Sequence, residues 1–133
     1  MAEQRERPLS PHLGIWRWGP GMAASIFHRI SGGALTVAGL AALTWWLLAL
    51  AKGADAYGDF LAIAKTWVGV VVLIGLTWAF FQHLLSGLRH FVMDAGAGYE
   101  LHTNRFWAWM ILVWAILLTA ALWAWIIYWR LPA

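Results

Sequence analysis

Three long stretches without any Asp, Glu, Lys or Arg dominate the chain. They cover residues 30–51, 66–88 and 106–129. A helix needs about 20 residues to cross the hydrocarbon core of a bilayer, and each stretch is long enough. The pattern therefore predicts three transmembrane helices, which we place at residues 25–51, 64–94 and 105–130.

Short polar segments separate these helices. We predict a cytoplasmic N-terminal segment at residues 1–24, a periplasmic loop at 52–63 and a cytoplasmic loop at 95–104. Such short connections force consecutive helices to run antiparallel. The predicted fold class is therefore all-α, an up-down-up bundle of three helices in a membrane. The composition supports this, because 62% of the residues are hydrophobic, only 11% are charged and 12 are tryptophan, which is unlike a soluble domain.

The basic residues favour one orientation of this bundle. Lys and Arg near helix ends accumulate on the cytoplasmic side of membrane proteins. With the N-terminus inside, that side holds Arg5, Arg7, Arg17, Arg29, Arg89 and Arg105, and the opposite side holds Lys52, Lys65 and Arg130. The first 24 residues contain acidic residues and three prolines, so they do not resemble a signal peptide. We expect a multi-pass protein of a bacterial inner membrane with a cytoplasmic N-terminus.

Cysteine is absent and the formal net charge is only +3. The first fact excludes disulfides, protein-ligated iron–sulfur clusters and covalent haem attachment through C-x-x-C-H. The second argues against nucleic acid as a partner, because the basic residues form no stripe. Any haem would be held without covalent attachment, by an axial histidine and by packing.

The second predicted span carries ionisable side chains on one face. His83, Gly87, His90 and Asp94 are separated by four, three and four residues, so they lie on the same side of a helix. An ionisable residue at membrane depth is costly and indicates a functional site. A glycine between the two imidazoles would let a flat group lie against the backbone. This face is typical of haem binding.

Each residue of this face also has an ordinary interpretation. His83 would be a buried histidine with a structural hydrogen bond, His90 an interfacial histidine, and Asp94 a helix-end carboxylate rather than a proton donor. At about 1.5 Å per residue, His83 lies roughly 10 Å deeper than His90. The two histidines therefore cannot ligate one iron, and His83 needs a ligand partner from elsewhere.

A second polar face lies at the start of the first span. Ser25, His28, Arg29 and Gly32 also share one side of a helix. Antiparallel topology brings this face to the same membrane surface as the end of the second span. A hydroxyl, an imidazole and a fixed cation suit a carbonyl ligand that gains negative charge on reduction. The alternative for Arg29 is an interfacial arginine that only sets the orientation in the membrane.

Three motifs occur in a characteristic order. They are R-P-L-S-P-H-L-G-I-W-R at residues 7–17, S-I-F-H-R-I-S-G at 25–32 and H-L-L-S-G-L-R-H-F-V-M-D at 83–94. In order and spacing the chain resembles the cytochrome b subunit that anchors succinate dehydrogenase, respiratory complex II, to the membrane. The resemblance covers the first two thirds of the chain, and the remainder is similar only as a hydrophobic helix.

This resemblance implies a role for each candidate site residue. His83 would be an axial ligand of haem b, whose second ligand comes from another membrane anchor, so that the chain is half of a heterodimeric anchor. His28 and Arg29 would lie near the haem propionates. Ser25 and Arg29 would line the ubiquinone site, with Asp94 close to it.

The resemblance also implies the partners and the function. Electrons from succinate oxidation in a flavoprotein subunit would pass through an iron–sulfur subunit to ubiquinone, and the chain alone would not be catalytic. Three alternatives remain open. They are an anchor of a quinol:fumarate reductase working in the reverse direction, a purely structural anchor without haem, and a di-haem protein that uses His28 and His83 within one chain.

Overall fold

A computed structural model describes residues 17–130, without the side chain of Arg130. The predictions for residues 1–16, including most of the first motif and of the N-terminal segment, lie outside the described residues. In the part that is described, all regular structure is helical: α1 (Pro20–Ala34), a π-helical turn η1 (Leu35–Gly39), α2 (Leu40–Lys52), α3 (Ala54–Ala64), α4 (Trp67–Asp94) and α5 (Leu101–Arg130). Three segments are long and apolar enough to cross a membrane, namely Pro20–Lys52, Trp67–Asp94 and Leu101–Trp129. The predicted all-α fold with three spans is confirmed.

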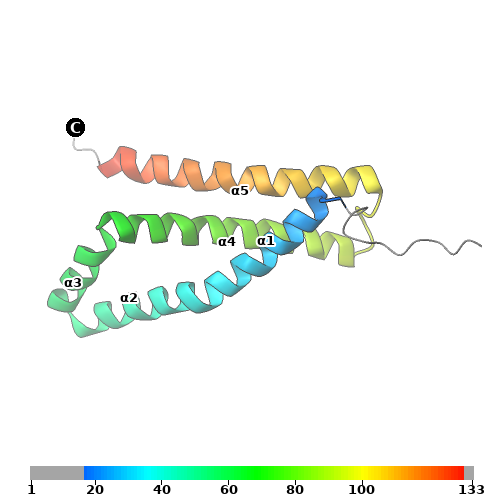
Figure 1. The fold of residues 1–133 in the computed structure, drawn as a ribbon. Coiled ribbons are helices and arrows are strands. Elements are labelled where there is room, and N and C mark those ends of the chain that lie inside the picture. The colour runs from blue at the N-terminus through cyan, green and yellow to red at the C-terminus, as the bar shows by residue number, and fades with distance from the viewer. Residues whose placement is uncertain (1–16, 131–133) are drawn as a thin grey trace, which may run out of the picture.

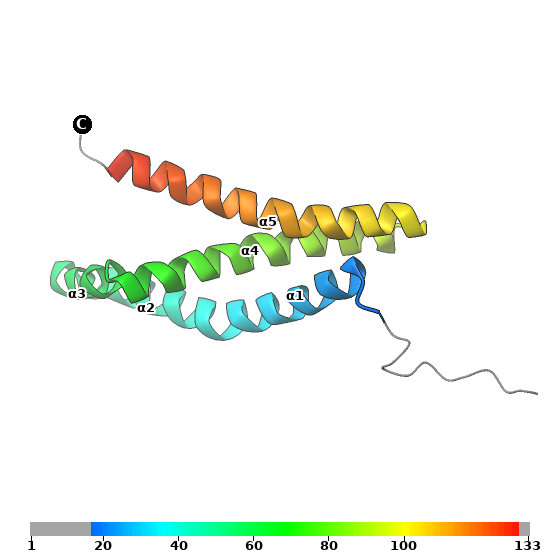
Figure 2. The same ribbon diagram turned by 45° about the horizontal axis from the view of Figure 1, so that its top comes forward.

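Helix α4 lies in the middle of the bundle (Figures 1 and 2). It contacts α1 and α5, and α1 also contacts α5. The contacts of α1 lie at the end of the bundle where α1 begins, α4 ends and α5 begins (Figure 1), whereas α4 and α5 also meet further along, where Nε1 of Trp123 donates to Oγ1 of Thr77 at 3.3 Å. Among the described elements, α2 contacts only η1 and α3, and it diverges from α4 toward the other end. The end where all three helices pack together is therefore the one that contains both predicted polar faces.

Several helices differ from the predicted bounds. The first begins at Pro20 instead of residue 25, because proline suits the first helical position, where no backbone donor is needed. Helix α5 begins at Leu101 instead of residue 105. Most of the predicted loop at 52–63 is helix α3, whose alanine-rich sequence favours a helix. Gly53, with a φ of 101°, makes the sharp turn between α2 and α3.

The bundle packs through small and polar side chains. The buried ones are Ala24 and Ser31 on α1, Ala49 on α2, Ala79, Gln82 and Ser86 on α4, and Ala108, Ile111, Ala115 and Thr119 on α5. Lipid tails are as apolar as leucine, so membrane helices associate through close backbone approach rather than through burial of large side chains. Most of the large apolar side chains accordingly point outward. Helix α5, which has no Asp, Glu, Lys, Arg or His between Phe106 and Trp129, contributes packing to this core.

Candidate functional site

Three imidazoles meet where α1 packs against the second half of α4. The rings of His28 and His83 stack with their centroids 4.1 Å apart and their planes 6° apart. The ring of His90 lies 5.2 Å from that of His28 and is tilted by 53°. The structure therefore brings together the polar faces of the first two spans, as the antiparallel topology predicts.

Helix α1 fixes the orientation of the His83 imidazole. Its Nδ1 lies 3.2 Å from the backbone carbonyl oxygen of His28 and 3.4 Å from Oγ of Ser31. A carbonyl oxygen only accepts hydrogen bonds, so this contact assigns the ring proton to Nδ1. Nε2 then has a free lone pair, and it has no hydrogen-bond partner among the described residues. An imidazole held through Nδ1 with Nε2 free is the usual state of a metal-ligating histidine.

Gly32 makes the close approach of His83 to α1 possible. A Cβ on Gly32 would lie only 2.9 Å from Cε1 and 3.3 Å from Nδ1 of His83. A side chain at this position would therefore displace the imidazole. At the neighbouring Gly33, a Cβ would meet no atom within 4 Å. The requirement for glycine is thus specific to the position that faces His83.

Gly87 lies on the same side of α4 as His83 and His90. The imidazole of His28 lies beside it, with Cε1 4.0 Å from the place of a Cβ. A flat group packed against Gly87 would require His28 to move. Among the described glycines, Gly32 lies closest to His83. In the sequence, Gly32 already stood out by its position on the polar face of the first span.

The other predicted residues lie at the same end of the bundle. Ser25 is half-buried on α1, and Arg29, one turn further, is exposed. Asp94 is exposed at the last position of α4. None of the three forms a hydrogen bond or ion pair through its side chain with another described residue. Their hydroxyl, guanidinium and carboxylate groups are therefore free to meet a ligand or another subunit.

Two buried polar side chains on α4 were missed in the sequence. Gln82 and Ser86 are one turn apart and 0% exposed. The amide oxygen and nitrogen of Gln82, Oγ of Ser86 and Nδ1 of His28 have no hydrogen-bond partner among the described residues. Such groups are usually satisfied by ordered water or by a partner. The available signal was a glutamine and a serine at i, i+4 in a charge-free span.

Sequence similarity to known proteins extends over most of the chain. The sequence model of the family described as succinate dehydrogenase/fumarate reductase transmembrane subunit matches residues 3–122. A succinate dehydrogenase cytochrome b556 subunit of Paracoccus denitrificans is 44% identical over 95 residues, which cover 71% of this chain and 72% of the relative.

Two further relatives match at greater length. The succinate dehydrogenase cytochrome b556 subunit of Rickettsia felis is 36% identical over 118 residues, covering 89% of this chain and 91% of its own. The succinate dehydrogenase cytochrome b560 subunit of Reclinomonas americana is 36% identical over 137 residues, covering 92% and 86%. The range matched by the family model includes both helices that form the histidine cluster. The chain therefore belongs to the family of succinate dehydrogenase and fumarate reductase transmembrane subunits, as a multi-pass membrane anchor of the succinate dehydrogenase cytochrome b type.

Proposed function

We propose that this membrane anchor binds haem b without covalent attachment, with His83 as an axial ligand of the iron. The main support is the fixed imidazole, whose Nδ1 faces the carbonyl oxygen of His28 at 3.2 Å and whose Nε2 has a free lone pair. When one ring nitrogen of a histidine ligates a metal, a hydrogen bond from the other nitrogen orients the ring and raises the basicity of the ligand. When bound, the haem supplies a redox centre in the membrane part of the complex.

The second axial ligand comes, in this proposal, from another membrane anchor, so that the chain forms half of a heterodimeric site. His28 does not suit that role. Its ring is nearly parallel to that of His83, and imidazole lone pairs lie in the ring plane, so the stacked rings do not direct two nitrogens at one iron. The stacking argues against haem held within one chain by these two histidines.

His28 and Arg29 are proposed to serve the haem propionates. Nδ1 of His28 is buried and has no partner in the described part of the chain, and the exposed guanidinium of Arg29 carries a charge of the opposite sign to a carboxylate. A charge-assisted hydrogen bond to a carboxylate is about twice as strong as a neutral one. The proposed place of haem against Gly87 requires the imidazole of His28 to shift.

We also propose a ubiquinone site at this end of the bundle. Two electrons, released when succinate is oxidised to fumarate in the flavoprotein subunit and passed through the iron–sulfur subunit, reduce the quinone, and two protons complete the quinol. Ser25 donates a hydrogen bond to a quinone carbonyl oxygen, and Arg29 stabilises negative charge developing on it. Asp94, at the same end, is the proposed proton donor. Their lack of partners within the described chain supports this assignment.

The proposed location is a bacterial inner membrane with the N-terminus in the cytoplasm. The distribution of Lys and Arg supports it, and it places the proposed quinone site at the cytoplasmic surface. A fumarate-reducing complex would use the same residues, because the direction depends on the potentials of quinone and partner subunits. We favour succinate oxidation because the relatives described above are succinate dehydrogenase subunits.

A reduced-minus-oxidised optical spectrum of the purified complex tests the haem proposal. We expect an absorption band of the b type, with stoichiometric haem that is extracted by acidic organic solvent because no covalent bond holds it. A fully assembled, active complex without this band would contradict the proposal and favour a purely structural anchor.

A valine at Gly32 is expected to weaken haem binding by about tenfold or more, the effect typical of disturbing the groups that orient a metal ligand. The new side chain would occupy the place of the His83 imidazole, which lies 2.9 Å from the position of a Cβ. The matched control is Gly33→Val, which adds the same β-branched residue where no atom lies within 4 Å. Haem-to-protein ratios of the two purified complexes give the measurement. Equal haem loss in both variants would show a general effect on α1 rather than contact with His83.

A further inference from the structure

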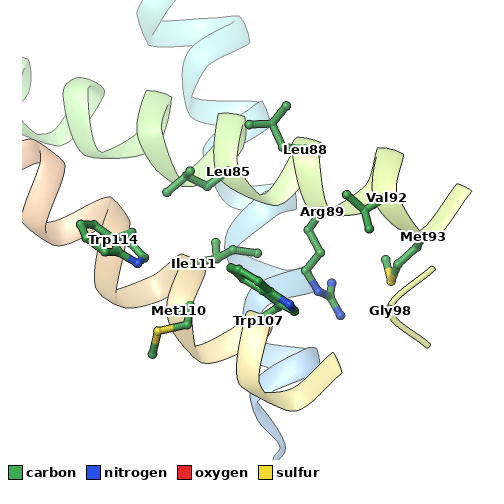
Figure 3. Close-up of a pocket in the computed structure, with 10 residues that line it drawn as sticks. All are labelled: Leu85, Leu88, Arg89, Val92, Met93, Gly98, Trp107, Met110, Ile111 and Trp114. Atoms are coloured by element: carbon green, nitrogen blue, oxygen red, sulfur yellow. The ribbon is translucent and has the colours of Figure 1, made fainter. Parts of the chain in front are cut away.

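A groove of about 350 Å³ lies between α4 and α5 (Figure 3). Its apolar walls are formed by Leu85, Leu88, Val92 and Met93 of α4 and by Trp107, Met110, Ile111 and Trp114 of α5. At about 100° per residue, Leu85, Leu88 and Val92 lie on the side of α4 opposite His83. The groove is therefore separate from the histidine cluster.

Arg89 is the charged residue that lines this groove within the described chain. Figure 3 shows its side chain extending from α4 toward α5. Its Nη2 donates to Oδ1 of Asn104 at 2.7 Å, and Nδ2 of Asn104 donates to the carbonyl oxygen of Gly98 at 3.3 Å. This neutral amide orients the guanidinium, but no described carboxylate pairs with it. The positive charge of Arg89 is therefore not neutralised by the part of the chain that the structure describes.

We propose that the groove binds an anionic phospholipid, with an acyl chain between α4 and α5 and its phosphate at Arg89. The apolar walls match the chemistry of the acyl chain. Arg89 lies little more than one turn before α4 ends at Asp94, which places the cation near the lipid headgroups, where arginine attracts negative charge. Trp107, near the start of α5, is a residue type enriched at this depth. A neutral phospholipid fits the apolar walls equally well, but we expect it to bind more weakly because its headgroup is attracted less strongly to Arg89.

Native mass spectrometry of the intact, delipidated complex tests this proposal with two probes, dioleoyl phosphatidylglycerol and dioleoyl phosphatidylcholine. We expect the wild-type complex to bind the anionic lipid about fivefold more tightly, which corresponds to about 1 kcal/mol for one basic residue at the headgroup level. Arg89→Gln should remove this preference. The matched control is Arg105→Gln, which removes an exposed arginine of the same membrane end that does not line the groove.

A further variant, Leu88→Trp, tests the acyl-chain part of the groove. It adds bulk to a lining side chain that is 51% exposed, and it should weaken binding of both lipids by a similar factor. Equal affinity of the wild-type complex for the two lipids would overturn the proposal, and this measurement needs no variant. An equal loss of preference in Arg89→Gln and Arg105→Gln would also overturn it, because it would show diffuse surface charge. Neither readout depends on haem or quinone, so the proposed function is tested separately.

Discussion

Replacing His83 by alanine is expected to remove the b-type absorption band from the purified complex. The substitution deletes the one imidazole of the cluster whose Nδ1 is held by a backbone carbonyl and whose Nε2 is free. Loss of a direct ligand should lower haem affinity by at least the roughly 10- to 100-fold seen when only the groups that orient a ligand are removed. The measurement is the reduced-minus-oxidised spectrum together with the haem-to-protein ratio.

The matched variant for this experiment is His90→Ala. It removes a second imidazole of the same cluster, 5.2 Å from the ring of His28, and the band should remain. Free imidazole added to His83→Ala should restore part of the band, because it can take the place of the deleted side chain. An unchanged spectrum in His83→Ala would exclude axial ligation by this residue. Loss of the band in both variants without rescue would indicate a structural role for the cluster.

Replacing Arg29 by alanine is expected to lower succinate:ubiquinone reductase activity by about a hundredfold or more, the effect of removing one donor that stabilises a developing oxyanion. Succinate oxidation with a soluble artificial acceptor should continue, because the proposed function assigns that reaction to other subunits. Arg29 is exposed and makes no hydrogen bond or ion pair with another described residue. The substitution therefore removes no hydrogen bond or ion pair within the described part of the chain, and folding should not change.

Two further variants separate chemistry from membrane orientation. Arg29→Lys keeps the charge but loses the planar fork of donors, so it should retain intermediate quinone reduction. Arg105→Ala removes another exposed arginine from the same end of the bundle and should retain full activity. If quinone reduction and dye reduction both persist in Arg29→Ala, this residue only helps to set the orientation of α1. If Arg105→Ala is equally impaired, the effect comes from total charge at this surface.

Gln82 and Ser86 were missed because the sequence prediction considered only ionisable residues as polar signals within the second span. Neither side chain carries a charge, and both are compatible with a membrane span in small number. Their burial depends on which side of α4 meets α1 and α5, and this was not encoded in the spacing of the histidines. Only the packing of three helices shows that both are fully enclosed.

The sequence by itself determined the number of spans, their antiparallel order and the two polar faces. These properties follow from local physics, because the bilayer requires about 20 apolar residues for each helix and the helical repeat decides which residues share a side. The spacing from His83 to Asp94 and from Ser25 to Gly32 was therefore enough to predict that both faces meet at one end. The helical character of α3 was missed, since a short connection can be a loop or a helix.

Only the tertiary structure decided which atoms face each other within the cluster. Three contacts depend on how α1 crosses α4. They are the stacking of His28 on His83, the hydrogen bond of the His83 Nδ1 to a carbonyl oxygen of α1, and the close approach of His83 to Gly32. The crossing results from the small side chains buried between the helices, which let their backbones approach closely. Contacts of 3 to 4 Å between residues more than 50 positions apart depend on that packing, and helical periodicity carries no information about it.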